Sequence, residues 1–178
     1  MPGMPNRLGA FLCLAAILAV VSGPVSAQAW KKHSYPADGF EVEFSGTVDT
    51  SREDLSKLSA GRAISEARYT QNTKTGGYAV WVTTLAEPNA AWEEASYAAF
   101  GAIGCQKVLE NRVLEVSGRR VLHLSGVGCI KGVLSVTARF TQVGPRIYQL
   151  LAIYPPTAGE SDSAQRFMNS FAILAGKE

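Results

Sequence analysis

Cysteine and histidine are the side chains of this sequence whose chemistry can be judged most directly from their spacing. The chain of 178 residues has three cysteines and two histidines, namely Cys13, Cys105, Cys129, His33 and His123. Neither histidine lies in an H-x₃-H or H-E-x-x-H pattern, which would bring two metal ligands together. A G-x-S-x-G motif, a phosphate-binding loop and a dinucleotide fingerprint are also missing. We therefore expect no catalytic residue, no metal site and no cofactor.

The two later cysteines flank a stretch that has the pattern of a long β-hairpin. Gly118 is a turn signal, and a three-residue loop over 116–118 with glycine at its left-handed last position is a common hairpin connection. In that register Cys105 lies opposite Cys129, and opposed residues of an antiparallel pair come within reach of a disulfide. We predict a Cys105–Cys129 disulfide. Two separate thiols, or a thiol nucleophile activated by His123, are the alternatives.

The compartment is indicated by residues 1–29. Arg7 precedes an apolar run over 8–21, and small residues at Ala27 and Ala29 follow the helix breakers Gly23 and Pro24. This is the layout of a cleaved secretory signal peptide, and the run is too short for a membrane span. We predict a mature protein that starts at Trp30 or Gln28 and is periplasmic or secreted, where an oxidising environment favours disulfides.

The remaining residues, 30–178, have the length of one domain. Without Arg7 they hold 16 basic and 15 acidic side chains, with no basic block. A near-neutral chain of this kind gives no electrostatic footprint for nucleic acid. We expect a single domain that binds no nucleic acid and has no stable membrane insertion after signal cleavage.

Hydrophobic periodicity predicts more strands than helices. Phe40, Val42 and Phe44 alternate with glutamates, which is typical of a half-buried strand. Residues 64–72 and 78–85 form a predicted hairpin with Gly76–Gly77 as its turn, and 132–142 and 146–155 form another. The segment between the strand at 40–44 and the hairpin at 64–85, residues 47–61, is polar.

Two amphipathic segments are predicted to be helical. The first, over 87–104, has a stripe made of Trp92, Ala95, Ala99 and Ile103. The second begins at Ser161 and has an apolar stripe made of Ala164, Phe167, Met168 and Phe171. Short turns between strands favour an α+β fold, a mostly antiparallel sheet with helices packed against it.

The order of several motifs resembles the PsbP-like family and its exported bacterial relatives of unknown function. The motifs are YPADGFEVEFSG, one central helix, VSGRR, GPRIYQLLAIYP and SAQRFMNSF, and the likeness covers residues 34 to 174. The resemblance implies an antiparallel sheet flanked by helices. It also implies an accessory protein that binds a protein partner, as the plant members do in assisting photosystem II, with no shared catalytic motif. The chain departs from the family pattern in having Cys105 and Cys129.

Three functions are compatible with these observations. The first is an exported accessory module that docks on a protein partner through the outer face of the last hairpin, where Arg139, Arg146, Tyr148 and Tyr154 should lie together. In the alternative interpretation of this face, a helix covers it. The second function is a carrier of a small apolar ligand, with a pocket lined by Tyr69, Tyr78, Trp81 and Phe100. The third is a thiol-dependent enzyme.

Overall fold

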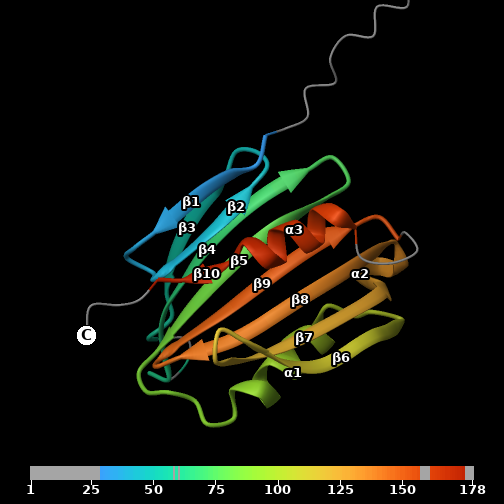
Figure 1. Ribbon diagram of the computed structural model, residues 1–178. Coiled ribbons are helices and arrows are strands. Elements are labelled where there is room, and N and C mark those ends of the chain that lie inside the picture. The colour runs from blue at the N-terminus through green and yellow to red at the C-terminus, as the bar shows by residue number, and fades with distance from the viewer. Residues whose placement is uncertain (1–28, 58, 60, 157–160, 175–178) are drawn as a thin grey trace, which may run out of the picture.

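Two antiparallel sheets and three short helices make up the computed structural model, which describes residues 29–57, 59, 61–156 and 161–174. The predicted signal peptide lies outside these residues except for Ala29. A three-stranded sheet has the order β1-β2-β10, and a seven-stranded sheet has the order β3-β4-β5-β9-β8-β7-β6. The fold class predicted from the sequence, α+β with mostly antiparallel strands, is confirmed (Figure 1).

The small sheet contains β1 (Lys31–Tyr35), β2 (Phe40–Phe44) and β10 (Ala172–Ile173). The large sheet contains β3 (Asp49–Asp54), β4 (Ala63–Thr73), β5 (Gly76–Leu85), β6 (Lys107–Val116), β7 (Arg119–Gly128), β8 (Leu134–Val143) and β9 (Arg146–Tyr154). The helices are α1 (Trp92–Ala102), the single turn α2 (Cys129–Gly132) and α3 (Asp162–Ser170).

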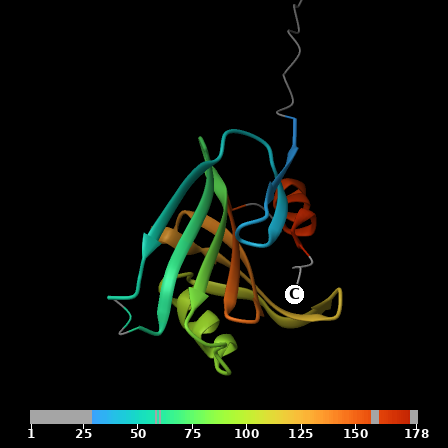
Figure 2. The same cartoon turned by 90° about the vertical axis from the view of Figure 1, so that its left-hand side faces the viewer.

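Each face of the large sheet is covered by its own hydrophobic core. On one face, β2 and α3 pack against β4, β5 and β9, with Phe40, Phe44, Phe167 and Tyr148 among the fully buried side chains. On the other face, Phe100 of α1 packs with residues of β5, β7, β8 and β9. Figure 2 shows the large sheet edge-on, with the small sheet and α3 together on one side of it.

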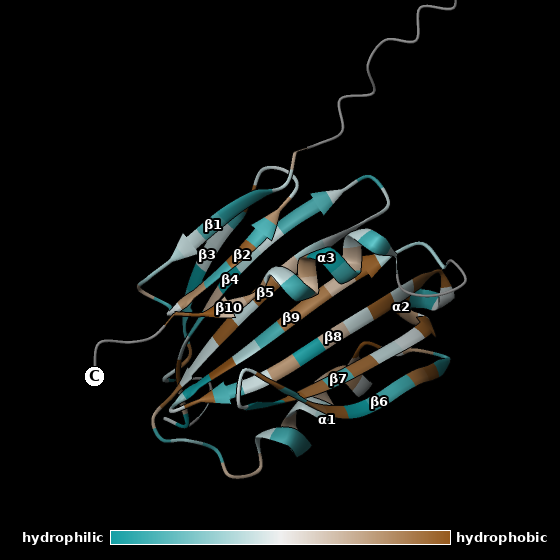
Figure 3. Ribbon diagram, in the orientation of Figure 1, coloured by the Kyte–Doolittle hydropathy of each residue, from teal (hydrophilic) through white to brown (hydrophobic). Residues whose placement is uncertain are grey.

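The clearest periodic signals in the sequence correspond to real elements. In β2 the phenylalanines and the valine are buried and the glutamates are half-buried, and alternating hydropathy can be followed along the strands in Figure 3. Helix α3 begins after Ser161, whose hydroxyl accepts a hydrogen bond from the Ala164 amide and so caps the helix. Ala164, Phe167 and Met168 are buried as predicted.

The N-terminal half contains one strand that was not predicted and one turn that was predicted at the wrong position. The polar segment 47–61 contains β3, an edge strand that pairs with β4 and has all six residues exposed. The hairpin formed by β4 and β5 turns at Lys74–Thr75, because Thr73 pairs with Gly76. Both glycines of the predicted turn therefore belong to β5. Gly77 is needed in the strand because a Cβ there would lie 2.6 Å from the carbonyl oxygen of Gln71.

The predicted apolar stripe of the first helix is correct for Trp92 and Ile103, which pack against the second core, and wrong for its two alanines. Helix α1 buries Ser96 and Phe100, while Ala95 and Ala99 are exposed. The hydroxyl of Ser96 donates to the carbonyl oxygen of Trp92 within the helix, so this polar side chain can face the sheet without losing a hydrogen bond. Phenylalanine at position 100 supplies the apolar area that the alanines lack.

Candidate functional site

The disulfide predicted between Cys105 and Cys129 is present. The register of the hairpin was predicted correctly at its open end and is shifted by one residue between the bulge and the turn. Val116 pairs with Arg119, so the turn has two residues, Ser117 and Gly118, both with positive φ, and a bulge at Leu109 shifts the register near the open end. A Cβ on Gly126 would lie 2.9 Å from Sγ of Cys105, so this glycine makes room for the bond.

The side chains of the predicted docking face lie together on one face of the last hairpin, as their alternation along the strands predicted. Tyr148, Leu150, Ala152 and Tyr154 share one face of β9, and they belong to the core formed with β2 and α3. Tyr148 is 2% exposed and Tyr154 is 8% exposed, so the expectation of an open surface there is wrong. The alternative interpretation holds, since α3 and the small sheet cover the face.

Two of the four candidate residues hold the turn between β1 and β2. Tyr148 Oη donates to the carbonyl oxygen of Asp38 at 2.9 Å, and Arg146 Nη2 donates to the carbonyl oxygen of Ala37 at 3.1 Å. Gly39 has a φ of 74°, and a Cβ there would meet both side chains. These residues therefore bind the chain's own small sheet.

Asp38 is the centre of this contact and is almost fully buried. Its carboxylate accepts two hydrogen bonds from Arg52, at 2.8 and 2.6 Å, and one from the hydroxyl of Tyr69. Burial acts to raise the pKa of Asp38, but the hydrogen bonds from Arg52 and Tyr69 outweigh it and hold the pKa below its usual value. The carboxylate thus joins β3 and β4 of the large sheet to the turn of the small one.

The other two candidate residues have different surroundings. The hydroxyls of Tyr154 and Thr137 lie 2.9 Å apart. Arg139 Nη1 donates to the carbonyl oxygen of Met168 at 2.9 Å and to Asn169 Oδ1 at 3.1 Å, which satisfies acceptors at the C-terminal end of α3. Arg139 Nε also donates to Nδ1 of His123 at 3.3 Å.

His123 is a buried strand histidine with defined partners on both ring nitrogens. Nε2 lies 3.0 Å from a carboxylate oxygen of Glu110, opposite the contact with Arg139. Burial lowers the pKa of His123, and the charges of Arg139 and Arg112 lower it further against the opposing effect of Glu110. The disulfide lies next to Gly126 on the other face of this hairpin, so His123 does not contact it.

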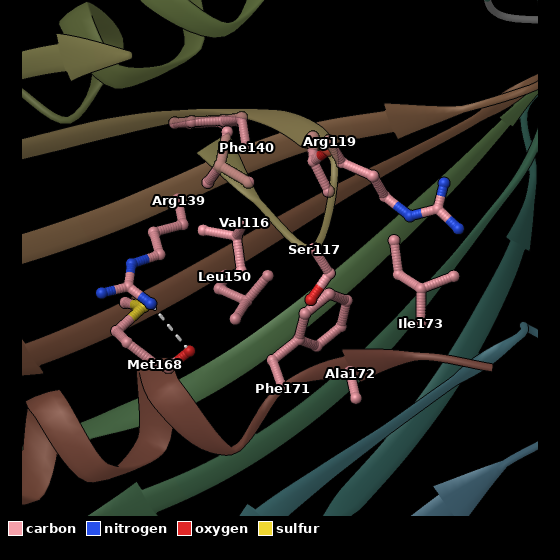
Figure 4. Close-up of a pocket in the computed structure, with 12 residues that line it drawn as sticks. Val116, Ser117, Arg119, Arg139, Phe140, Leu150, Met168, Phe171, Ala172 and Ile173 are labelled. Atoms are coloured by element: carbon pink, nitrogen blue, oxygen red, sulfur yellow. Dashed lines mark hydrogen bonds between the residues drawn. The ribbon is translucent and has the colours of Figure 1, made fainter. Parts of the chain in front are cut away.

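A pocket opens where the tip of the β6–β7 hairpin approaches the segment after α3. It has a volume of about 180 Å³. The lining residues are Val116, Ser117, Arg119, Val121, Arg139, Phe140, Thr141, Leu150, Met168, Phe171, Ala172 and Ile173. In Figure 4, Val116 and Ser117 lie over Leu150 and Phe171, and the two arginines lie on either side of this apolar floor.

Charge in the pocket has one sign. The lining includes Arg119 and Arg139 and no carboxylate. Arg139 is anchored by α3 as described, whereas Arg119 is an exposed residue at the start of β7. The chemistry that fits is an apolar group with a negative charge beside it.

The aromatic set predicted to line a carrier pocket is divided by the large sheet. Tyr69 and Tyr78 pack with the core under β2 and α3, whereas Trp81 and Phe100 pack with the core under α1. They therefore cannot line one cavity, and the prediction is wrong. The pocket at the hairpin tip was not visible in the sequence, because its residues come from five strands and α3.

Within the described residues, no three His, Cys, Asp or Glu side chains are grouped so that they could hold a metal ion. None of the described helices combines the length and the hydropathy of a membrane-spanning segment.

Comparison with known proteins identifies the fold. No protein-family model matches the chain, and no curated protein matches it significantly. Among solved structures, the chain is similar to the solution structure of cyanobacterial PsbP (CyanoP) from Synechocystis sp. PCC 6803. The TM-score is 0.51 at 11% sequence identity, over 85% of this chain and 96% of that chain. The chain has a PsbP-like fold, and at this identity the likeness extends to the fold alone.

Proposed function

We propose that the protein is an exported, non-catalytic binding module that captures a segment of a protein partner in the pocket between the β6–β7 hairpin tip and residues 171–173. The observation that carries the proposal is the pairing of an apolar floor with Arg119 and Arg139. A segment with an aromatic or branched side chain next to a carboxylate, either acidic or at a C-terminus, would complement both parts.

Pocket size favours a partner's side chain over a complete small ligand. Sites for drug-sized ligands span about 300–1,000 Å³, whereas an apolar cavity of about 150 Å³ takes up a single benzene ring. The volume of about 180 Å³ is on the scale of one ring. A carrier of lipid-like ligands is therefore less well supported than the docking module.

Binding of a minimal mimic tests the site. We expect 3-phenylpropionate, an aromatic ring with a nearby carboxylate, to bind with a Kd on the order of millimolar, since so few atoms give little binding energy. Chemical shifts in the NMR spectrum should move at Val116 and Ile173. The neutral analogue 3-phenyl-1-propanol should bind several-fold more weakly because it lacks the charge that faces Arg119.

Two variants locate the binding. Arg119→Glu reverses the charge at the pocket. We expect it to raise the Kd of 3-phenylpropionate more than about tenfold. Lys74→Glu makes the same change of charge at the exposed β4–β5 turn and should leave binding unchanged. Equal affinities for the acid and the alcohol, or shifts spread away from the pocket, would contradict the proposal.

Export is the second part of the proposal and is supported by the disulfide, since such bonds persist in oxidising compartments. We expect the protein purified from the producing cell's exported fraction to have the intact mass of a chain beginning at Trp30 or Gln28. Cell fractionation followed by mass spectrometry measures this. Recovery of the uncleaved chain from the cytosolic fraction would refute it.

A further inference from the structure

The large sheet ends in two edge strands of different character. β3 is one edge and β6 is the other (Figure 1). β3 is six residues long and every residue is polar or charged. β6 is ten residues long and exposes four large apolar side chains, Val108, Leu109, Val113 and Val116, by 43–53%. Long edges with exposed apolar residues are ready to pair with another strand, and proteins usually block them.

A second copy of β6 would have to pair under strict geometric conditions. A twofold axis perpendicular to the sheet makes two edge strands antiparallel, and directly opposed side chains then point to the same face. In β6, Glu110 and Arg112 share the face of His123, because they pair with Ser125 and His123 of β7. Asn111 and Val113 point to the face of α1, since they pair with Leu124 and Leu122.

Only a few registers satisfy this condition near the centre of the strand. If Glu110 opposes itself, two carboxylates meet, and if Arg112 opposes itself, two guanidinium groups meet. If Asn111 opposes itself, Glu110 of each copy faces Arg112 of the other, which gives two opposite-charge pairs. We propose that β6 pairs antiparallel with β6 of a second copy of this chain, with Asn111 on the twofold axis.

In this register, the contacts between the two copies involve side chains that are exposed on β6 in the single chain. Glu110 and Arg112 lie 3.0 Å apart within one chain, so two such pairs form an alternating group of four charges across the axis. Val113 meets the bulged Val108–Leu109 segment of the second copy, where all three side chains are exposed in the single chain. The free backbone groups of both edges gain hydrogen-bond partners.

The dimer should be weak and reversible. A single pair of strands buries less than the roughly 1,200–2,000 Å² of stable interfaces, so we expect a Kd on the order of 10–100 µM. Sedimentation velocity over a range of concentrations on either side of this value measures it. Amide hydrogen exchange of β6 in the wild-type protein should slow as the dimer forms, while exchange of β3 should not change.

Charge reversal gives the decisive test. Glu110→Arg leaves two arginines and Arg112→Glu leaves two glutamates, so each variant alone should dimerise at least about tenfold more weakly than the wild type. An equimolar mixture should form the heterodimer, because each arginine then faces a glutamate of the other chain. Melting curves establish that both variants are folded, which matters for Glu110→Arg because Glu110 also contacts His123.

Several outcomes would overturn the proposal. They are a wild-type protein that stays monomeric at all concentrations, single variants that dimerise as the wild type does, and a mixture that stays monomeric. If a variant does not fold, amide hydrogen exchange of β6 in the wild-type protein is the remaining test. A rate of exchange that does not depend on protein concentration refutes the pairing. Loss of 3-phenylpropionate binding in Arg119→Glu with the dimer intact would separate this surface from the pocket.

Discussion

Reduction of the Cys105–Cys129 disulfide is expected to lower the free energy of unfolding by about 3.5 kcal/mol, because the bond closes a short loop and restricts the unfolded chain. The two cysteines are 24 positions apart in the sequence. For a domain of this size such a loss corresponds to a fall in Tm of roughly 7–14 °C. The double variant Cys105→Ser with Cys129→Ser should show at least this loss without a reducing agent.

Thermal unfolding with and without a reductant measures this effect. Because Cys129 is fully buried, the serine variant also places a hydroxyl in the core, and reduction of the wild type is therefore the cleaner comparison. Thiol titration of the folded, air-exposed protein should find no reactive cysteine among the described residues. Two titratable thiols, or a Tm that does not respond to reduction, would show that the bond does not form in solution.

Asp38→Ala is expected to destabilise the protein by about 2–3 kcal/mol, since it leaves the buried hydroxyl of Tyr69 without its acceptor. Arg52 regains water because its side chain is about half exposed, which limits the loss. Tyr69→Phe removes only the hydroxyl and should cost about 1 kcal/mol. Urea unfolding of both variants measures these losses, and an Asp38→Ala protein as stable as the wild type would contradict the role of the carboxylate.

The same carboxylate makes stability depend on pH in a definite direction. The pKa of Asp38 is lower in the folded protein than its ordinary value of 3.8. Its contribution is therefore fully present above that value and is lost as the pH falls through the folded pKa. Asp38→Asn should lack this part of the acid destabilisation, so the stabilities of variant and wild type should converge at low pH. Curves that stay parallel would assign the acid sensitivity to other groups.

Strand pattern and face parity could be predicted from the sequence because they depend on local periodicity. The alternation in β2 and the apolar stripe of α3 are set by residues a few positions apart, and parity in β8 and β9 needs only a short turn. The disulfide was also predictable, since two cysteines flank one hairpin in a chain with the pattern of an exported protein.

The remaining features depend on contacts between distant segments. β3 has no apolar alternation, because an edge strand exposed on both faces needs none. Tyr148 looked like a surface residue because the strand that covers it, β2, lies more than a hundred positions earlier. The pocket residues have the composition of ordinary core and turn positions, and only their convergence distinguishes them.

Because of the bulge at Leu109, the alignment of the two cysteines depends on the number of residues in the β6–β7 hairpin. An uninterrupted ladder from the Ser117–Gly118 turn would present Cys105 to Ile130, and the extra residue at Leu109 restores the alignment with Cys129. Hairpins at a protein surface usually accept insertions and deletions during evolution. Here the loss of one residue from β6 would leave Cys105 opposite Ile130, so that the two sulfur atoms would no longer be aligned for the bond. Exposed side chains between the cysteines that belong neither to the pocket nor to the proposed strand pairing can vary, whereas the number of residues must keep Cys105 and Cys129 aligned.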